Sequence, residues 1–312
     1  MKRIFVLTAL LAVTFQLSAR DLSRYMPDRT IVFAQYDTLM LGMDVYLPND
    51  GEATHKCMVY TYGGGFMDNN QRARSTMEFC RTLADRNHFV VVAIDYRLGL
   101  KGFVSKGTLS MVKPLENSVK MAAEDLFKAV KVILDNAQAL TVDPNLIILC
   151  GSSAGAITSL QADYELCHRT PMTAQMDEDF RFAGVISFAG AVFSREGKCT
   201  YPVHAPAPTF FLHGKSDKLV TYGKIAFFNM RFSGSDDLVK QFKKNNYPHE
   251  IMRFVDEGHG VAARMMDNYD DVIWFVDNMV LSKRGFEIDQ TVWDKDHKRT
   301  SWDKSGPGAL YK

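Results

Sequence analysis

The sequence predicts an α/β protein whose central sheet is mostly parallel, has about eight strands and carries helices on both faces. Two patterns predict this fold class. Short apolar runs rich in β-branched and aromatic residues alternate along the chain with segments of helical periodicity. One of these runs, residues 89–94, is apolar at every position, which is typical of a parallel strand buried on both faces. A length of 312 residues, 46% of them hydrophobic, is sufficient for one large domain of this kind.

The first 19 residues have the organisation of a secretory signal peptide. Two basic residues precede an apolar run at residues 4–13, and we expect cleavage after Ala19, although Leu17 is larger than the small residue preferred at that position. An uncleaved membrane anchor is the alternative, but the run is shorter than the roughly 20 apolar residues of a spanning helix. We therefore expect an exported protein, periplasmic or secreted, with no stable membrane insertion after cleavage.

The mature chain is predicted to open with a β-hairpin. Residues 31–36 and 43–47 are rich in strand formers, and the second run ends at a turn cluster, Pro-Asn-Asp-Gly, at residues 48–51. Residues 56–62 form a third strand that runs into three consecutive glycines at residues 63–65. Because glycine adopts positive φ angles without strain, these glycines predict a loop that needs an unusual backbone conformation.

Helices and strands then alternate. Apolar residues recur at helical spacing over residues 75–87 and 116–136, with the buried strand and a long loop, residues 98–114, between them. An apolar burst at residues 146–149 predicts the central strand, and residues 154–167 continue as a helix. The other expected strands are residues 184–188, 209–212 and 250–255, and the other expected helices are residues 235–245 and 261–281.

We expect one domain over residues 20–283, followed by a C-terminal extension over residues 284–312. The extension is polar and carries a few aromatic residues. We expect it to pack back on the domain through Trp293 and Trp302, and the alternative is a contact with substrate or with a partner.

The five cysteines are compatible with an oxidising compartment but do not form an even set. Cys57, Cys80 and Cys150 lie in expected strands and a helix, where cysteine behaves as a small buried hydrophobic residue. Cys167 and Cys199 fall in loop-like surroundings and are the candidate disulfide pair.

Net charge argues against a nucleic acid partner. Lys and Arg number 37 against 36 Asp and Glu, and no long basic stripe is present. The chain therefore lacks the electrostatic footprint of a nucleic-acid-binding protein.

The central strand ends in the sequence on which the functional interpretation depends. Gly151, Ser153 and Gly155 fit the pattern G-x-S-x-G, in which a tight strand-to-helix turn exposes a nucleophilic serine. A frame centred on Ser152 would put a cysteine and an alanine at the glycine positions. Ser153 is therefore the candidate nucleophile, against the alternative of a glycine-serine turn without chemistry.

Attack on an acyl carbonyl also needs donors for the oxyanion that forms. Gly64 and Gly65 follow the third strand, and their backbone N–H groups are the expected donors together with that of Ala154, the residue after the nucleophile. The alternative is that these glycines form an ordinary flexible turn.

A histidine and a carboxylate in suitable loops complete the set. His259 lies between glycines directly after the last expected strand and is the candidate general base, with His213 as its rival. Asp217 follows a strand and is the candidate carboxylate that orients the base, with Asp256 as competitor. The order Ser153, Asp217, His259 is that of the α/β hydrolases.

These motifs together resemble the HGGG-type serine esterases of the α/β-hydrolase fold, and within them the secreted bacterial carboxylesterases and feruloyl-esterase-like hydrolases. The resemblance covers residues 31–281. The motifs that carry it are residues 62–66 (Tyr-Gly-Gly-Gly-Phe), 94–98 (Ile-Asp-Tyr-Arg-Leu), 151–155, 213–217 and 257–260.

One residue departs from the family pattern. The family has a histidine that props the oxyanion loop where this chain has Tyr62, whose hydroxyl is able to take the same part. Asp95 and Arg97 match a structural signature of the family and are expected to support that loop as a polar pair.

The resemblance implies a serine esterase that uses no metal and no cofactor. Its substrate would be a small-molecule or polysaccharide-linked ester, with acetyl or feruloyl groups as candidates and residues 103–112 and 227–235 bordering the pocket. Two alternatives remain at this point: a serine peptidase of the prolyl-oligopeptidase type, and a non-catalytic binding module on the same fold.

Overall fold

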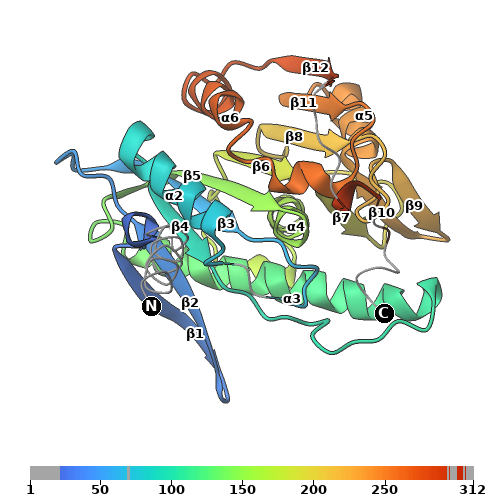
Figure 1. Cartoon of the computed structure of the whole chain (residues 1–312), viewed down its shortest axis with the longest axis horizontal. Coiled ribbons are helices and arrows are strands. Elements are labelled where there is room, and N and C mark those ends of the chain that lie inside the picture. The colour runs from blue at the N-terminus through green and yellow to red at the C-terminus, as the bar shows by residue number, and fades with distance from the viewer. Residues whose placement is uncertain (1–21, 69–70, 294, 296–300, 305, 307–312) are drawn as a thin grey trace, which may run out of the picture.

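A computed structural model describes residues 22–68, 71–293, 295, 301–304 and 306. The expected signal peptide lies outside these residues. In the described part the main sheet has nine strands in the order β1-β2-β4-β3-β5-β6-β8-β11-β12 (Figure 1). Its strands are β1 (Arg29–Tyr36), β2 (Leu39–Tyr46), β3 (His55–Thr61), β4 (Val90–Ile94), β5 (Val142–Ser152), β6 (Gly184–Phe188), β8 (Thr209–Gly214), β11 (His249–Phe254) and β12 (Glu287–Val292).

Strand direction confirms the predicted fold class. The hairpin β1–β2 and the pair β2–β4 are antiparallel, and every other pair in this sheet is parallel. The helices are α2 (Arg74–Asn87), α3 (Thr108–Asp135), α4 (Ala154–His168), α5 (Ser235–Asn245) and α6 (Tyr269–Phe275), which continues as the π-helical η4 (Val276–Leu281). Short 3-10 helices are η1 (Ser23–Tyr25), η2 (Pro171–Thr173), η3 (His259–Ala263) and η5 (Trp302–Lys304).

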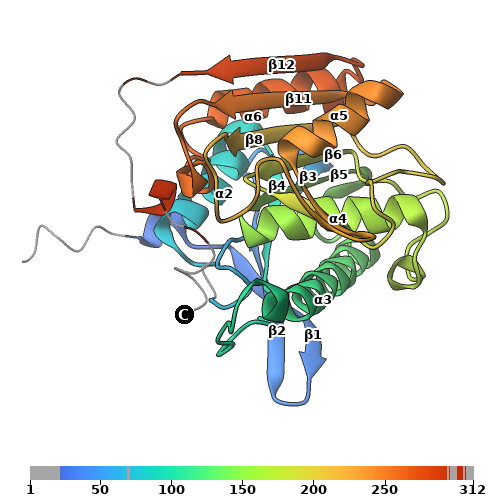
Figure 2. The ribbon, with the colours of Figure 1, turned by 90° about the vertical axis from the view of Figure 1, so that its right-hand side faces the viewer.

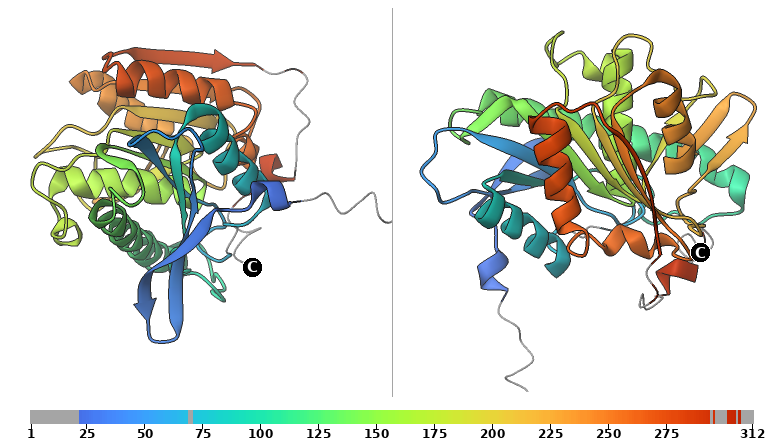
Figure 3. Two further views of the ribbon diagram at one scale, coloured as in Figure 1. Left: turned by 90° about the vertical axis from the view of Figure 1, so that its left-hand side faces the viewer. Right: turned by 90° about the horizontal axis from the view of Figure 1, so that it is seen from above.

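Helices cover both faces of the main sheet and enclose two hydrophobic clusters (Figures 1 and 3). Successive side chains of a strand point to opposite faces, so Met58 and Tyr60 of β3 enter one cluster and Cys57 and Val59 the other. Helices α2 and α6 contribute to the first cluster, and α5 together with most of α3 and α4 to the second. All-apolar strands such as β4 are therefore buried on both sides.

Helix α3 begins earlier than the sequence suggested. The expected loop at residues 98–114 is wrong in its second half, because α3 starts at Thr108 and contains Pro114. The loop was expected because this segment has several glycines and no clear helical period, and Pro114 itself disfavours a helical conformation in the residue before it. The packing of Met111 and Leu115 against the first cluster outweighs this local preference.

The helix expected at residues 261–281 is interrupted. Its first part is the 3-10 helix η3, and α6 starts only at Tyr269. The Ala262 carbonyl in η3 accepts a hydrogen bond from Ser152 Oγ at 2.6 Å, which ties η3 to the end of β5. Helix η3 therefore belongs to the carboxyl edge of the sheet and not to α6.

The C-terminal segment packs back on the domain, but through other residues than Trp293. Residues of β12 pair in parallel with β11, so the main sheet continues past residue 283. Trp293 is 66% exposed and does not anchor the segment, and the side chain of Trp302 lies outside the described part of the chain.

A second, antiparallel sheet was not predicted. It consists of β7 (Ala191–Ser194), β10 (Met230–Gly234) and β9 (Lys224–Phe227), in that order. The sequence of β9, Lys-Ile-Ala-Phe, does not alternate between apolar and polar residues, so it lacks the pattern of a half-buried strand. In the structure every residue of β9 is exposed.

The cysteines are free and buried in the structure. The candidate pair Cys167–Cys199 is not formed: the Cys167 thiol donates to the Ala205 carbonyl and the Cys199 thiol to Ser233 Oγ, each at 3.5 Å. Each thiol thus has its own oxygen partner.

Between residues 22 and 306, no helix that the structure describes combines the length and the apolar character needed to cross a membrane.

Candidate active site

Ser153 occupies a sharp turn between β5 and α4. Its φ of 53° and ψ of −118° lie in a region that residues with side chains rarely adopt. The turn is held by a hydrogen bond from the Ser153 N–H to the Phe188 carbonyl at 2.9 Å, and by one from the Ile157 N–H to the Ser153 carbonyl at 2.9 Å. These bonds fix an otherwise unfavourable backbone, as expected for a nucleophile elbow.

The two glycines of the motif are required by close packing. A Cβ atom on Gly155 would lie 1.9 Å from the Thr61 carbonyl oxygen, and one on Gly151 would lie 2.3 Å from the Gly155 carbonyl oxygen. Helix α4 therefore approaches β3 and β5 only because both positions lack a side chain.

The two neighbouring serines face different partners. Ser152 is buried and its hydroxyl donates to the Ala262 carbonyl. Ser153 Oγ lies 2.8 Å from His259 Nε2 and at the edge of a cavity. The structure thus places Ser153, and not Ser152, beside the predicted base.

Asp217 continues this chain of hydrogen bonds. Its Oδ2 atom lies 2.7 Å from His259 Nδ1, and its side chain is fully buried. Ser153, Asp217 and His259 follow the carboxyl ends of the parallel strands β5, β8 and β11. The structure therefore brings together three residues that are far apart in sequence, in the arrangement that the motif order predicted.

The surroundings of Asp217 hold it in the ionised form. The N–H groups of Leu219 and Val220 donate to its Oδ1 at 2.8 and 3.0 Å. Burial on its own would raise the pKa of Asp217, but the hydrogen bonds from His213 and His259 outweigh it and lower the pKa well below the usual range. A carboxylate that stays charged is able to orient His259 and stabilise an imidazolium.

His213 and Asp256, the alternative candidates for base and acid, lie in positions that do not suit those roles. His213 is buried, with Nδ1 2.8 Å from Ser235 Oγ and Nε2 3.3 Å from Asp217 Oδ2, and so supports the acid and not the nucleophile. Asp256 is exposed and has a φ of 62° at the turn before the base. It therefore lacks the burial that an orienting carboxylate needs.

The acid and base loops are packed backbone to backbone. The Ser216 N–H donates to the Glu257 carbonyl at 2.9 Å. A Cβ atom on Gly214 would lie 2.2 Å from the Gly258 carbonyl oxygen, so this contact needs a glycine. The distance between Asp217 and His259 is consequently set by main-chain contacts.

The glycine loop after β3 lies against the elbow. A Cβ atom on Gly63 would be 3.2 Å from the Cβ of Ser153. Gly65 and Ala154 line the same cavity as Ser153. The carbonyl of Gly64 accepts the N–H groups of the third and fourth residues after it, at 3.0 and 3.1 Å, and so closes the turn. Gly64 and Gly65 have φ angles of 138° and 61°, and the first of these values is suited to glycine alone.

Tyr62 supports this loop through two contacts. Its hydroxyl donates to Asp95 Oδ1 at 3.4 Å, and its ring stacks on Tyr96 with centroids 4.7 Å apart. The Tyr96 hydroxyl also donates to the Tyr62 carbonyl at 3.0 Å. Asp95 therefore acts on the loop, whereas Arg97 donates to Glu124 and Asp125 of α3 at 2.8 and 3.0 Å.

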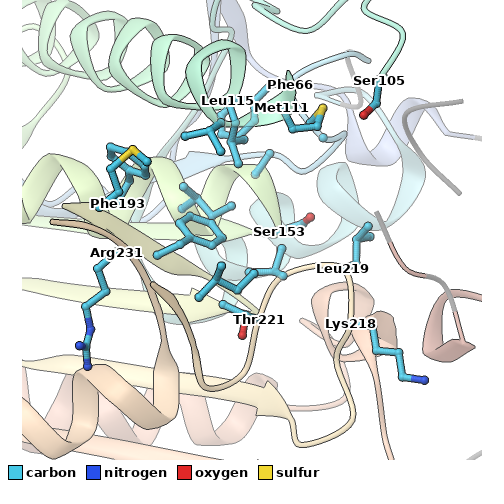
Figure 4. A pocket seen from close by; sticks show the side chains of 18 of the residues that line it. Phe66, Ser105, Met111, Leu115, Ser153, Phe193, Lys218, Leu219, Thr221 and Arg231 are labelled. Carbon is cyan, nitrogen blue, oxygen red and sulfur yellow. The ribbon is translucent and has the colours of Figure 1, made fainter. Parts of the chain in front are cut away.

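A cavity of about 340 Å³ opens beside Ser153 (Figure 4). Most of its wall is apolar. The guanidinium of Arg231 points away from Ser153 and binds Asp237, with Nε 2.8 Å from the carboxylate. The apolar lining comes from the glycine loop after β3, helices α3 and α4, the second sheet and the loop after Asp217: Phe66, Met111, Val112, Leu115, Ile157, Phe193, Leu219, Val220, Ile225, Phe227, Met230 and Phe232.

The two segments expected to border the pocket both contribute to it. Residues 103–112 supply part of the wall, and residues 227–235 supply another part. Phe193 and the loop at Leu219 and Val220 were not predicted as lining residues. The apolar run at residues 191–193 and the position of the loop directly after Asp217 were the available signals.

A mostly parallel sheet covered by helices, with a strained serine elbow at its carboxyl edge, defines the α/β hydrolases. The model of the Carboxylesterase family matches residues 25–192, which is more than half of the chain. The chain therefore belongs to the carboxylesterase family. The matched region includes the glycine loop and Ser153 and ends before Asp217 and His259.

Curated relatives match over part of their length. The chain is 35% identical over 130 residues to Esterase FE4 of Myzus persicae, which is 40% of this chain and 21% of that protein. It is 28% identical over 117 residues to Fumonisin B1 esterase of Sphingopyxis macrogoltabida, which is 37% of this chain and 21% of the relative. The chain thus spans about a fifth of the length of these relatives.

Among solved structures, the native form of the thermophilic esterase Est2 of Thermogutta terrifontis has the same fold. The TM-score is 0.59 at 21% sequence identity, and the match covers 84% of this chain and 96% of Est2.

Proposed function

We propose that this protein is an exported serine hydrolase that cleaves carboxylic esters through an acyl-enzyme. The observation that carries the proposal is the position of His259, whose Nε2 lies 2.8 Å from Ser153 Oγ and whose Nδ1 lies 2.7 Å from the buried Asp217. A serine becomes a nucleophile at neutral pH when an oriented base accepts its proton. Membership of the carboxylesterase family supports an ester as the substrate.

In the first half of the reaction, Ser153 Oγ attacks the ester carbonyl carbon while His259 Nε2 takes the hydroxyl proton. The Asp217 carboxylate stabilises the imidazolium that forms. When the tetrahedral intermediate collapses, the bond to the alcohol breaks and His259 returns the proton to the leaving oxygen. The acyl group then remains on Ser153.

In the second half, water takes the place of the alcohol. His259 accepts a proton from the attacking water. When the second tetrahedral intermediate collapses, the bond between the acyl carbon and Ser153 Oγ breaks and His259 returns the proton to Ser153 Oγ, which releases the acid and restores the hydroxyl. Protons thus move only among Ser153, His259, water and the leaving alcohol, while the Asp217 carboxylate stays charged throughout.

Main-chain donors complete the proposed machinery. We assign the oxyanion to the N–H groups of Gly64, Gly65 and Ala154. Ala154 is the first residue of α4, so its N–H has no acceptor within the helix. The packing of the glycine loop against Ser153 supports the other two donors. One such donor typically contributes roughly 10²–10³-fold to the turnover rate.

The cavity points to an ester with a large apolar group. Apolar side chains dominate its wall, and an acetyl group would leave most of about 340 Å³ unfilled. Of the two polysaccharide-linked candidates, the aromatic feruloyl group suits this lining better than acetyl. Forms of Thermogutta terrifontis Est2 with propionate or butyrate bound exist, so a short acyl ester is the matched comparison substrate.

Export is proposed from the apolar run at residues 4–13 and the small residues that follow it. Mass spectrometry of the protein recovered from the periplasm or medium tests this. A mature chain that starts at Arg20 supports the proposal, and an intact Met1 on the recovered protein contradicts it.

Replacement of the nucleophile tests the function. Ser153→Ala should lower kcat on an aryl ester by at least roughly 10³-fold, because Ser153 Oγ is the hydroxyl that the described part of the chain places against His259 Nε2. Ser152→Ala is the matched control and should keep at least about a tenth of the wild-type kcat, since Ser152 bonds a carbonyl and not the base. A fluorophosphonate should label the wild-type protein and not Ser153→Ala; Thermogutta terrifontis esterase 2 phosphorylated by paraoxon is a precedent for such probes.

Three outcomes would reject the proposal. Equal ester hydrolysis by Ser153→Ala and wild type would remove Ser153 from the reaction. Faster cleavage of an aminoacyl anilide than of the aryl ester would point to a peptidase. Absence of both labelling and turnover would point to a binding module.

A further inference from the structure

The C-terminal turn η5 lies against η3, the short helix that begins with His259 (Figure 2). Its central residue is Asp303, which is more than forty positions away from His259 in sequence. The segment therefore returns to the carboxyl edge of the sheet after β12 has ended.

A single carboxylate oxygen of Asp303 holds the backbone on both sides of the base. Asp303 Oδ1 accepts the N–H of Gly258 at 3.1 Å and the N–H of Gly260 at 3.3 Å. These are the residues directly before and after His259. N–H groups at the start of a helix have no acceptor within it, and bonds to an ionised carboxylate are stronger than bonds to a neutral group.

The two glycines fit this contact closely. A Cβ atom on Gly258 would lie 2.3 Å from the Asp303 carbonyl oxygen, and one on Gly260 would lie 2.6 Å from Asp303 Oδ1. Gly258 has a φ of −108°, and Gly260 also lies outside the left-handed region. The left-handed conformation therefore does not account for the glycines that flank His259, whereas the approach of Asp303 does.

We infer that Asp303 is a positioning residue for His259, a role that rests on the proposed function. By fixing the main chain on both sides of the base, it keeps His259 Nε2 within reach of Ser153 Oγ. Asp217 orients the imidazole ring through Nδ1, and Asp303 sets the position of the backbone that carries the ring. The C-terminal segment is thus a working part of the site.

Two substitutions at one position separate positioning from general stability. Asp303→Ala removes the acceptor and should lower kcat on an aryl ester by about 10- to 100-fold, with KM within about twofold of wild type. Asp303→Asn keeps an acceptor oxygen and should recover most of the lost kcat. Lys304→Ala lies on the same turn and is exposed, so it is the matched control and should retain wild-type kcat.

The melting temperature of each variant is measured beside its kinetics. A kcat of Asp303→Ala within twofold of wild type overturns the inference. So does an Asp303→Asn variant that is as slow as Asp303→Ala, or a rate loss that disappears when the assay temperature is lowered in step with the melting temperature. If neither wild type nor Ser153→Ala turns over the ester, the proposed function is rejected. If wild type is active and Asp303→Ala is as active as wild type, only the positioning role of Asp303 is rejected.

Discussion

Ser153 has an unfavourable backbone conformation, which turns its hydroxyl toward the cavity. A non-glycine residue in such a region typically costs about 1–3 kcal/mol, which the surrounding contacts must offset. Here the bond to the Phe188 carbonyl joins the turn to the neighbouring strand, and the Ile157 N–H binds the Ser153 carbonyl. The strain thus serves to hold the hydroxyl clear of the helix that follows.

Asp163 is a buried carboxyl group away from this site, in α4. Its Oδ2 accepts the Ala207 N–H at 3.1 Å, but burial dominates and raises the pKa of Asp163 to about 7. In the unfolded chain the pKa is near the ordinary value, about 3.9. Because the pKa of Asp163 is higher in the folded than in the unfolded state, protonation of Asp163 stabilises the folded protein. This contribution to the free energy of unfolding is complete below about pH 4 and is lost as the pH rises through 7.

Asp163→Asn should therefore stabilise the protein, and more so at high pH. The amide cannot ionise and its oxygen is still able to accept the Ala207 N–H. We expect the melting temperature to rise by several degrees at pH 8, and by less at pH 5, in thermal unfolding followed by circular dichroism. The same shift at both pH values, or a lower melting temperature at pH 8, would contradict this account.

At the scale of elements, the hairpin β9–β10 forms one wall of the cavity while much of it stays in solvent. Phe227 lines the cavity and is 52% exposed, and the next residue, Phe228, is 90% exposed and is not part of the lining. The hairpin is thus expected to contact an apolar substrate group directly, with little role in the core.

Phe227→Ala should weaken binding of a bulky ester selectively. Loss of part of an aromatic contact is worth about 1 kcal/mol, so KM for a feruloyl ester should rise roughly fivefold while KM for an acetyl ester stays within about twofold. Phe228→Ala is the matched control and should leave both KM values unchanged. An equal change for the two esters, or an effect of Phe228→Ala as large as that of Phe227→Ala, would rule out the assigned role.

The elements that the sequence predicted well are those with strong periodicity. The all-apolar run of β4 and the amphipathic pattern of α2 needed only local information, and their ends agree within about two residues. The start of α3 and the form of η3 depend on tertiary contacts, at Met111 and Ala262 respectively. Strand β9 has no hydrophobic alternation, so no sequence pattern predicted it.

At the scale of the whole molecule, topology made the site predictable. Parallel strands bring their carboxyl ends to one edge, so residues that follow β5, β8 and β11 had to meet there. The G-x-S-x-G motif predicted Ser153, and the loops after strands together with the order of the three residues predicted Asp217 and His259. Asp303 was not predicted, because it is one acid in a polar segment and its contact depends on how the chain returns after β12.

The bond between Ser152 Oγ and the Ala262 carbonyl has a mechanical consequence. Ala262 is in the same short helix as His259, and Ser152 adjoins Ser153, so two hydrogen bonds join η3 to the end of β5 and the turn that follows it. A displacement of η3 would stretch both bonds together. The nucleophile and its base therefore tend to move together. The distance between Ser153 Oγ and His259 Nε2 is then little changed by motions of the side chains that line the cavity.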